Sequence, residues 1–172
     1  KGSHTAMKEL YDEWSGYLFA LCLRYVPDRE TAGDILQDSL VKIFSNAGSF
    51  SYKGPGSLKA WISRIAVNEA LQYLRKKKGG EMIEYKDSLP DIVSEEPEEA
   101  DIGKIPANVL QKMIEELPEG YRTIFNLFVF EEMSHKEIAA ALGISESTSA
   151  SQFHRARKLL ARKIKEYGKG LD

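Results

Sequence analysis

The chain has 172 residues, of which 42% are hydrophobic, so it forms one or two domains with cores of modest size. Its net charge of −2 argues against a general nucleic-acid coat protein, but it leaves room for local basic patches. A single cysteine, Cys22, excludes an internal disulfide and fits a reducing compartment. No uninterrupted apolar run approaches membrane-spanning length, so we expect a cytoplasmic protein without membrane insertion.

The first part of the chain predicts three helices. Residues 1–7 (KGSHTAM) have the composition of a cloning remnant, and we expect them to lie outside the fold. Residues 8–25 carry apolar side chains at three- and four-residue spacing, which predicts a helix. Pro27 ends that helix, and Asp28 is a suitable N-cap for a second helix over residues 29–47.

The second predicted helix has two distinct sides. The core side is apolar and consists of Leu36, Leu40 and Ile43. The opposite side is polar except for one valine, and it consists of Asp34, Gln37, Asp38 and Val41. Such a side is usually a solvated face, but an apolar residue among polar ones also marks protein contacts.

Residues 48–57 (GSFSYKGPGS) predict a loop, because they contain three glycines and a proline. The loop carries Phe50, Tyr52 and Lys53. Aromatic rings beside positive charge are typical of proteins that bind unpaired bases. The alternative is that these aromatic rings pack back onto the helices.

A third helix is predicted over residues 58–78, with Ser57 as its N-cap. Its buried side consists of Leu58, Trp61, Ile62 and Ile65, and a neighbouring stripe consists of Arg64, Asn68, Leu71 and Arg75. The segment from Lys59 to Lys78 holds six cations and one anion. This charge favours a polyanionic ligand, although lysine-rich helix ends also serve solubility.

Residues 79–106 differ from their surroundings in composition. They contain three prolines, three glycines and nine acidic side chains against two lysines, which predicts an acidic linker. The linker accounts for the acidic total while the flanking segments remain basic.

The second part of the chain, residues 107–172, predicts another helical bundle. Helices are expected over residues 107–117 and 121–130, followed by a helix-turn-helix over residues 134–160. Ser134 and Glu137 match a capping box, Gly143 fits a left-handed helix end, and Ser145 caps the last helix.

The last helix carries short polar residues followed by cations along one side: Ser147, Thr148, Ser151, Arg155, Lys158, Arg162 and Lys165. Short side chains that reach base edges, with cations that meet phosphates, are typical of a helix in a DNA groove. An ordinary helical hairpin with a basic surface is the alternative. No segment shows the alternation of a strand, so the predicted fold is all-α.

Three stretches, in this order, give the chain a close resemblance to bacterial RNA polymerase sigma factors. They are DILQDSLVKIF at residues 34–44, YKGPGSLKAWISRIAVNEALQYLRKKK at residues 52–78, and LPEGYRTIFNLFVFEEMSHKEIAAALGIS with HRARKLL at residues 117–145 and 154–160. Together they resemble the extracytoplasmic-function (ECF) group of the sigma-70 family. The resemblance covers residues 10–164, except for the linker.

The resemblance implies a non-enzymatic protein that gives core RNA polymerase its promoter specificity. It implies that residues 8–78 are sigma region 2, which binds core polymerase and the −10 promoter element. Residues 107–172 would be sigma region 4, which binds the −35 element. Promoter DNA and core polymerase are the expected partners, with an anti-sigma factor as a further partner and no cofactor.

Site residues follow from the same resemblance. Core polymerase would bind Asp34, Gln37, Asp38, Val41 and Lys42. The −10 element would contact Tyr52, Lys53, Trp61, Arg64, Asn68, Arg75 and Lys76. The −35 element would contact Ser147, Thr148, Ser151, Gln152, His154, Arg155 and Lys158.

The sequence departs from the family pattern in two places. Ala150 and Gln152 stand where many members carry a basic residue, which predicts fewer or different DNA contacts there. The loop admits two registers, with either Phe50 or Tyr52 as the aromatic that holds a flipped base. Counting forward from Gln37 favours Phe50, whereas counting back from Trp61 favours Tyr52; we prefer Tyr52 because Lys53 and Gly54 then match as well.

Two other classes of function were weighed. A stand-alone helix-turn-helix regulator would use only the second bundle and leave the polar helix and the aromatic loop unexplained. An enzyme would need converging reactive groups. The only histidines are His4, His135 and His154, and no metal-ligand or nucleophile pattern surrounds them in the sequence.

Overall fold

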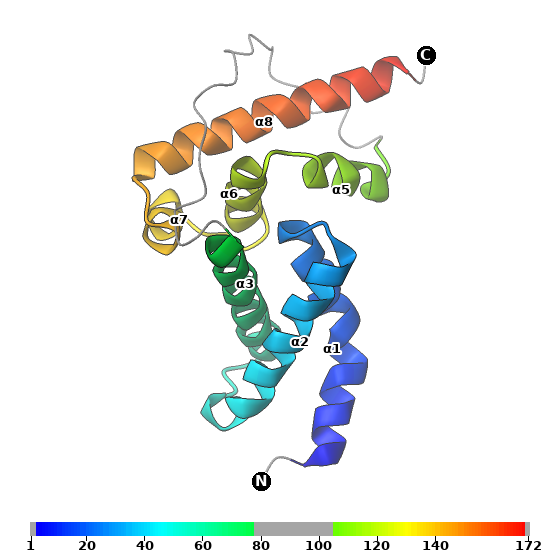
Figure 1. Ribbon diagram of the computed structural model, residues 1–172, viewed down its shortest axis with the longest axis vertical. Helices are drawn as coiled ribbons and strands as arrows, with labels where there is room; N and C mark the ends of the chain where they lie inside the picture. The colour runs from blue at the N-terminus through cyan, green and yellow to red at the C-terminus, as the bar shows by residue number, and fades with distance from the viewer. Residues whose placement is uncertain (1–2, 78–104, 171–172) are drawn as a thin grey trace. The chain divides into compact units, whose positions relative to one another are not determined.

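The computed structural model describes residues 3–77 and 105–170 of the chain, and these residues are all-helical, without a strand (Figure 1). The chain divides into two compact units, Lys1–Gly80 and Glu81–Asp172. The predicted acidic linker lies outside the described residues, apart from Ile105 and Pro106. The all-α prediction is confirmed for the described ranges.

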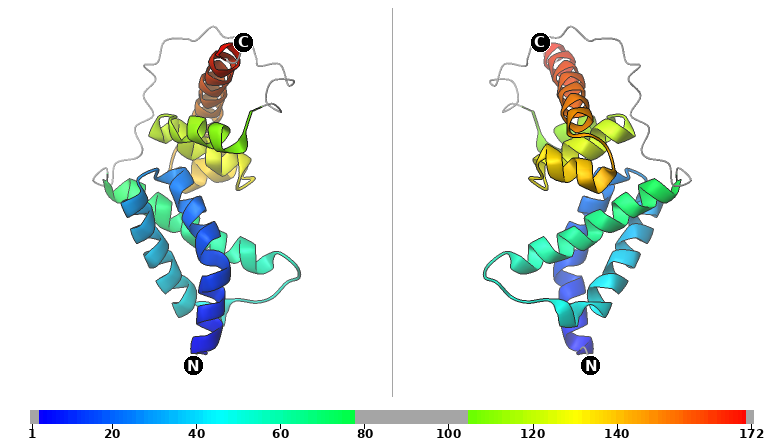
Figure 2. Two further views of the ribbon diagram at one scale, coloured as in Figure 1. Left: turned by 90° about the vertical axis from the view of Figure 1, so that its right-hand side faces the viewer. Right: turned by 90° about the vertical axis from the view of Figure 1, so that its left-hand side faces the viewer.

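Residues 3–77 of the first unit form three α-helices, and each of them packs against the other two. They are α1 (His4–Tyr25), α2 (Arg29–Ser45) and α3 (Ser57–Lys77), and a 3-10 turn, η1 (Ala47–Ser49), follows α2. The loop between η1 and α3 projects from the side of this unit (Figure 2). Asp28 caps α2 as expected, because its carboxylate accepts a hydrogen bond from the Thr31 amide at 2.8 Å.

The core of the first unit matches the predicted periodicity only in part. Leu18, Leu21, Ile43 and Ile62 are fully buried, as expected. Of the other residues predicted to face the core, Leu36, Leu58, Trp61 and Ile65 are only half-buried, and Leu71, which was predicted on the polar stripe of the third helix, is buried. One boundary differs, because α1 begins at His4 and therefore includes four residues that we expected outside the fold. Their side chains are exposed, so the extension adds a helical turn without adding to the core.

The described residues of the second unit form four helices: α5 (Ala107–Glu115), α6 (Glu119–Val129), α7 (His135–Leu142) and α8 (Glu146–Lys169). The long α8 packs against the other three. Arg122 joins α5 to α6, since its guanidinium donates hydrogen bonds to the carbonyl oxygens of Glu115 at 3.0 Å and Leu117 at 2.8 Å. Lys163 of α8 pairs with Glu116 at 2.6 Å.

The helix-turn-helix has the local chemistry that the sequence predicts. The Ser134 hydroxyl accepts from the Glu137 amide, and the Glu137 carboxylate accepts from the Ser134 amide, which completes the capping box. Gly143 ends α7 with a φ of 67°. The Ser145 hydroxyl accepts from the Thr148 amide at 3.0 Å and starts α8.

A matched pair of glycine substitutions tests this turn. Gly143→Ala is expected to destabilise the second unit by about 1–2 kcal/mol, because a β-carbon is strained at positive φ. Gly168→Ala is expected to stabilise it by up to about 1 kcal/mol, because Gly168 lies inside α8 with open space around its α-carbon.

Urea unfolding of the full chain measures both effects. Circular dichroism follows both units, whereas tryptophan fluorescence follows the first unit alone, because Trp14 and Trp61 both lie there. The two substitutions should shift the circular dichroism transition in opposite directions and leave the fluorescence transition unchanged. Equal shifts of both substitutions in one direction would contradict the assigned turn.

Candidate nucleic-acid and protein interfaces

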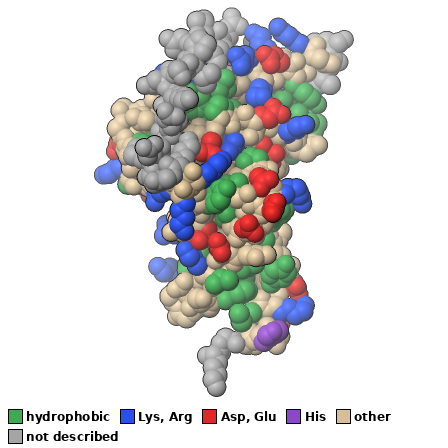
Figure 3. Space-filling model, viewed as in Figure 1, with side chains coloured by type: hydrophobic (Ala, Val, Ile, Leu, Met, Phe, Trp, Pro, Cys, Tyr) green, Lys and Arg blue, Asp and Glu red, His purple; other side chains and the backbone are tan. Residues whose placement is uncertain are grey.

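The polar side of α2 forms an exposed surface. Asp34, Gln37 and Asp38 are exposed, and Val41 beside them has an exposed fraction of 63%. Acidic side chains gather over α2 in the space-filling view (Figure 3). An apolar side chain that is this exposed on a helix of a folded unit suits a protein contact.

Lys42, the fifth residue predicted for polymerase binding, is engaged within the first unit. Its ammonium group forms an ion pair with Glu69 of α3 and lies 3.5 Å from the Gln72 side-chain oxygen. Lys42 therefore links the α2 surface to α3, next to Asn68. The sequence indicated an exposed cation here but gave no sign of this pairing.

The exposed side of α3 is basic. Four predicted −10 contact residues are exposed along it: Arg64, Asn68, Arg75 and Lys76. On another side of the helix, Tyr17 of α1 shares a hydrogen bond with Ser63 at 2.9 Å, and the Lys59 ammonium lies 4.8 Å from the centre of the Tyr17 ring. These contacts hold α3 against α1 while its polar stripe faces solvent.

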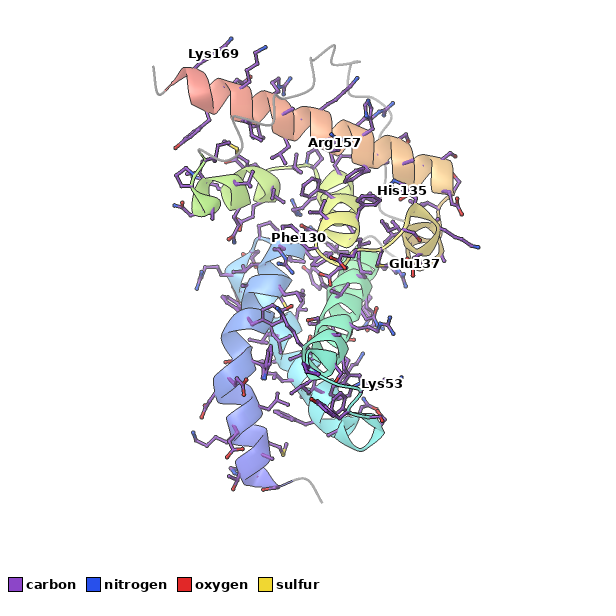
Figure 4. All side chains as sticks on the ribbon, turned by 180° about the vertical axis from the view of Figure 1, so that it is seen from behind. Lys53, Phe130, His135, Glu137, Arg157 and Lys169 are labelled. Carbon is purple, nitrogen blue, oxygen red and sulfur yellow. The ribbon has the colours of Figure 1, made fainter. Side chains whose placement is uncertain are left out.

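The two aromatic residues of the loop behave differently. The Phe50 ring packs on Trp61 of α3, with ring centres 5.2 Å apart, whereas Tyr52 has an exposed fraction of 70%. Lys53, labelled in Figure 4, follows Tyr52 and is also exposed. The loop thus offers one exposed aromatic ring next to one cation, the combination that suits an unpaired base.

The start of α8 presents hydroxyl groups and cations. Ser147, Ser151 and His154 are exposed, and Thr148, Arg155 and Lys158 are half-buried. These six residues lie on the part of the helix that a DNA groove would receive in the predicted arrangement.

The prediction for Gln152 is wrong. Its side chain has an exposed fraction of 1%, so it lies in the core of the second unit and is not available on the surface for a DNA contact. The physical reason is helical spacing: Ser149, Gln152 and Ala156 are three and four residues apart, and all three are buried on one side of α8.

A contact between α7 and α8 was missed by the sequence reasoning. The His135 Nδ1 lies 3.0 Å from the hydroxyl of the buried Ser149, and its ring stacks on Phe128 at 4.7 Å between centres. Phe153 packs against the same Phe128 ring at 4.3 Å. Figure 4 labels His135 near the point where α6, α7 and α8 meet. The cluster therefore links α6, α7 and α8 through side-chain contacts.

Cys22 is a buried, free cysteine of the first unit. Burial raises the pKa of the Cys22 thiol to about 12, so the thiol stays protonated and unreactive at neutral pH. Within residues 3–77 and 105–170, no group of three His, Cys, Asp or Glu side chains could hold a metal ion. No helix in those ranges is long and apolar enough to cross a membrane.

Comparisons with known proteins agree with this geometry. The model of "Sigma-70 region 2" matches residues 10–79, and the model of "Sigma-70, region 4" matches residues 107–160. The matches coincide with the three-helix unit and with the helices from α5 through most of α8.

Several relatives are similar along nearly their whole length. The ECF RNA polymerase sigma factor SigW of Bacillus subtilis is 28% identical over 177 residues, covering 96% of this chain and 92% of the relative. The RNA polymerase sigma factor SigV of the same bacterium is 30% identical over 142 residues, covering 83% and 81%.

Among solved structures, the sigma factor RpoE of Bartonella quintana, in complex with the anti-sigma factor NepR, shares the fold. Its TM-score is 0.54 at 24% identity, with 92% of this chain and 96% of that chain covered. With both sigma regions matched in order and a 30% identical relative covered over most of its length, the chain belongs to the extracytoplasmic-function group of the sigma-70 family.

Proposed function

We propose that this protein binds core RNA polymerase, recognises the −10 and −35 promoter elements and promotes transcription initiation. The observation that carries the proposal is the exposed Tyr52 on a loop beside the basic stripe of α3, in the same chain as a capped helix-turn-helix. One unit suits unpaired bases and the other suits duplex DNA, and a protein that opens a promoter needs both.

Core polymerase would dock on the exposed side of α2. Asp34, Gln37 and Asp38 supply polar contacts around the apolar Val41, an arrangement that suits an interface with an apolar centre and a polar rim. Lys42 contributes by fixing this surface to α3 through Glu69.

The −10 element would be bound as single-stranded DNA. Tyr52 stacks on an extruded base, Asn68 reads a base edge, and Lys53, Arg64, Arg75 and Lys76 neutralise phosphates. Extruding a base costs a few kcal/mol, and its capture by an aromatic ring offsets part of that cost. Trp61 supports the loop by packing on Phe50.

The −35 element would be read as duplex by the start of α8. Ser147, Thr148 and Ser151 lie in the first two turns, where short side chains reach base edges. His154, Arg155 and Lys158 follow at helical spacing and suit phosphate contacts. Gln152 is left out of this surface because it is buried.

Arg155→Ala tests the phosphate contacts. We expect weaker binding to −35 duplex and a salt dependence shallower by about one phosphate, because one counterion fewer is released. Arg157→Ala is the matched control, since Arg157 is exposed on the same helix but lies about 160° around the helix axis from Arg155. Titrations at several salt concentrations give both slopes, and an unchanged slope for Arg155→Ala would remove it from the phosphate contacts.

The proposal extends to compartment and partners. A factor that works on core polymerase acts in the cytoplasm, without a cofactor and without catalysis of its own. An anti-sigma factor is the proposed regulatory partner, supported by the complex of the similarly folded RpoE of Bartonella quintana with NepR.

Reconstitution tests the function. The full chain is mixed with core polymerase from its source bacterium and analysed by gel filtration, followed by run-off transcription on genomic promoter fragments. Co-elution and promoter-dependent transcripts are expected. A stand-alone regulator would instead bind duplex tightly without polymerase, and failure to associate with core would overturn the proposal.

A further inference from the structure

The loop that carries Tyr52 is tied down on its N-terminal side by Phe50. The Phe50 ring is half-buried against Trp61, with a ring-centre distance of 5.2 Å and an interplanar angle of 44°. The Phe50 amide also donates a hydrogen bond to the Ala47 carbonyl oxygen at 3.2 Å, which continues from η1. A hydrogen bond therefore fixes the backbone of Phe50, and the contact with Trp61 fixes its side chain.

The C-terminal side of the loop is tied down by Ser57. Its hydroxyl donates to the Gly54 carbonyl oxygen at 2.7 Å and lies 3.3 Å from the Lys53 amide, which donates to it. Gly54 and Gly56 adopt φ angles of 120° and 83°, which lets the chain turn sharply into α3. Tyr52 lies between these two attachments and is the exposed part of the loop.

Phe50 also affects where Tyr52 can go. An exposed aromatic side chain next to a tryptophan gains free energy by packing on it. Here Phe50 is the loop aromatic that packs on Trp61, and the Tyr52 ring is exposed to solvent. A ring already placed for its ligand avoids the ordering cost of binding.

We propose that Phe50 is a positioning residue, which occupies Trp61 and holds the loop so that Tyr52 remains available to an unpaired base. This inference rests on the proposed function, in which Tyr52 captures that base. Phe50 acts through Tyr52 and does not touch DNA itself. The proposal assigns different roles to the two loop aromatics, with Phe50 as the anchor and Tyr52 as the base contact.

The anchoring part is measured without DNA or polymerase. In a Trp14→Phe background, Trp61 is the sole tryptophan of the full chain, so acrylamide quenching measures how accessible the Trp61 ring is to solvent. Phe50→Ala should increase the quenching of Trp61. Phe50→Leu and Tyr52→Ala should both leave the quenching close to that of the background chain. Unchanged quenching in Phe50→Ala would overturn the anchor, whatever the chain does with polymerase.

The positioning part is measured with the holoenzyme on a promoter fragment whose −10 region is already opened by mismatches. Phe50→Ala should weaken binding to this fragment by about tenfold, the upper range for loss of an aromatic pair, and Phe50→Leu should recover most of it. Tyr52→Leu should not recover the loss caused by Tyr52→Ala, because stacking needs a ring.

A double-mutant cycle separates positioning from a general structural role. Phe50→Ala combined with Tyr52→Ala should bind the opened fragment no worse than Tyr52→Ala alone, because the anchor works through the tyrosine. If the losses of affinity caused by Phe50→Ala and Tyr52→Ala add in the double variant, the proposal is overturned. It is also overturned if Tyr52→Ala leaves the affinity unchanged while Phe50→Leu lowers it. If the wild-type chain fails to bind core polymerase, the proposed function is wrong. The quenching measurement still tests, independently of that result, whether Phe50 covers Trp61.

Discussion

Replacement of Tyr52 by alanine is expected to slow promoter opening by about tenfold to a hundredfold and to leave core polymerase binding unchanged. The magnitude follows from the stacking of one base on one aromatic ring, which contributes about 1–3 kcal/mol. The selectivity follows from geometry, since Tyr52 is exposed on the loop and the predicted docking surface lies on α2. Permanganate reactivity of the −10 thymines measures opening, and fluorescence anisotropy measures core affinity.

Tyr11→Ala provides a matched control for this substitution. Tyr11 is also an exposed tyrosine of the first unit, with an exposed fraction of 49%, but it lies on α1 outside both predicted surfaces. It should open promoters at the wild-type rate. If Tyr52→Ala reduces core binding and opening equally, Tyr52 is part of the docking surface or of the fold, and its base-stacking role is wrong.

Val41→Asp is expected to weaken the affinity for core polymerase by about thirtyfold or more. A charged side chain in the apolar centre of a contact loses its hydration, at a cost of about 2 kcal/mol or more. The new carboxylate also joins Asp34 and Asp38 on the same side of α2 and adds to their repulsion. Because Val41 is exposed in the free protein, thermal unfolding should change little.

Ala20→Asp is the control for Val41→Asp. Ala20 is an exposed apolar residue of α1, in the same unit, and it lies outside the predicted docking surface. Both variants add one negative charge, so a general charge effect on polymerase binding would appear in both. Wild-type core affinity in Val41→Asp would show that the exposed side of α2 does not dock on the polymerase.

Most helix boundaries of the fold can be predicted from local sequence signals. Asp28, Ser134, Gly143 and Ser145 mark helix ends because their side chains or φ angles satisfy backbone groups within a few residues. The exposure of Val41 follows from helical periodicity alone. The early start of α1 does not, because the composition of residues 1–7 suggested a foreign segment, whereas the helix begins at His4.

Gln152 shows where the family resemblance misled. The resemblance placed it among the −35 contacts, but its spacing from Ser149 and Ala156 puts it on the buried side of α8. Spacing was the stronger signal, because a helix turns by 100° per residue whatever its side chains are.

Contacts between segments that are distant in the chain could not be predicted from the sequence. The packing of Phe50 on Trp61, the pairing of Lys42 with Glu69 and the contact of His135 with Ser149 all depend on how helices pack in space. Each contact changes the interpretation of a predicted site. The first gives Phe50 and Tyr52 different surroundings, the second pairs Lys42 within the first unit, and the third links α7 to α8 in the helix-turn-helix. The binding roles themselves stay predictions.

Sequencing the DNA that the full chain and core polymerase retain together from a random library tests the central claim most directly. The account predicts two enriched elements at a constant spacing, both dependent on core polymerase, with Tyr52→Ala reducing enrichment of the downstream element. A single element or a palindrome, enriched equally without polymerase, would contradict it.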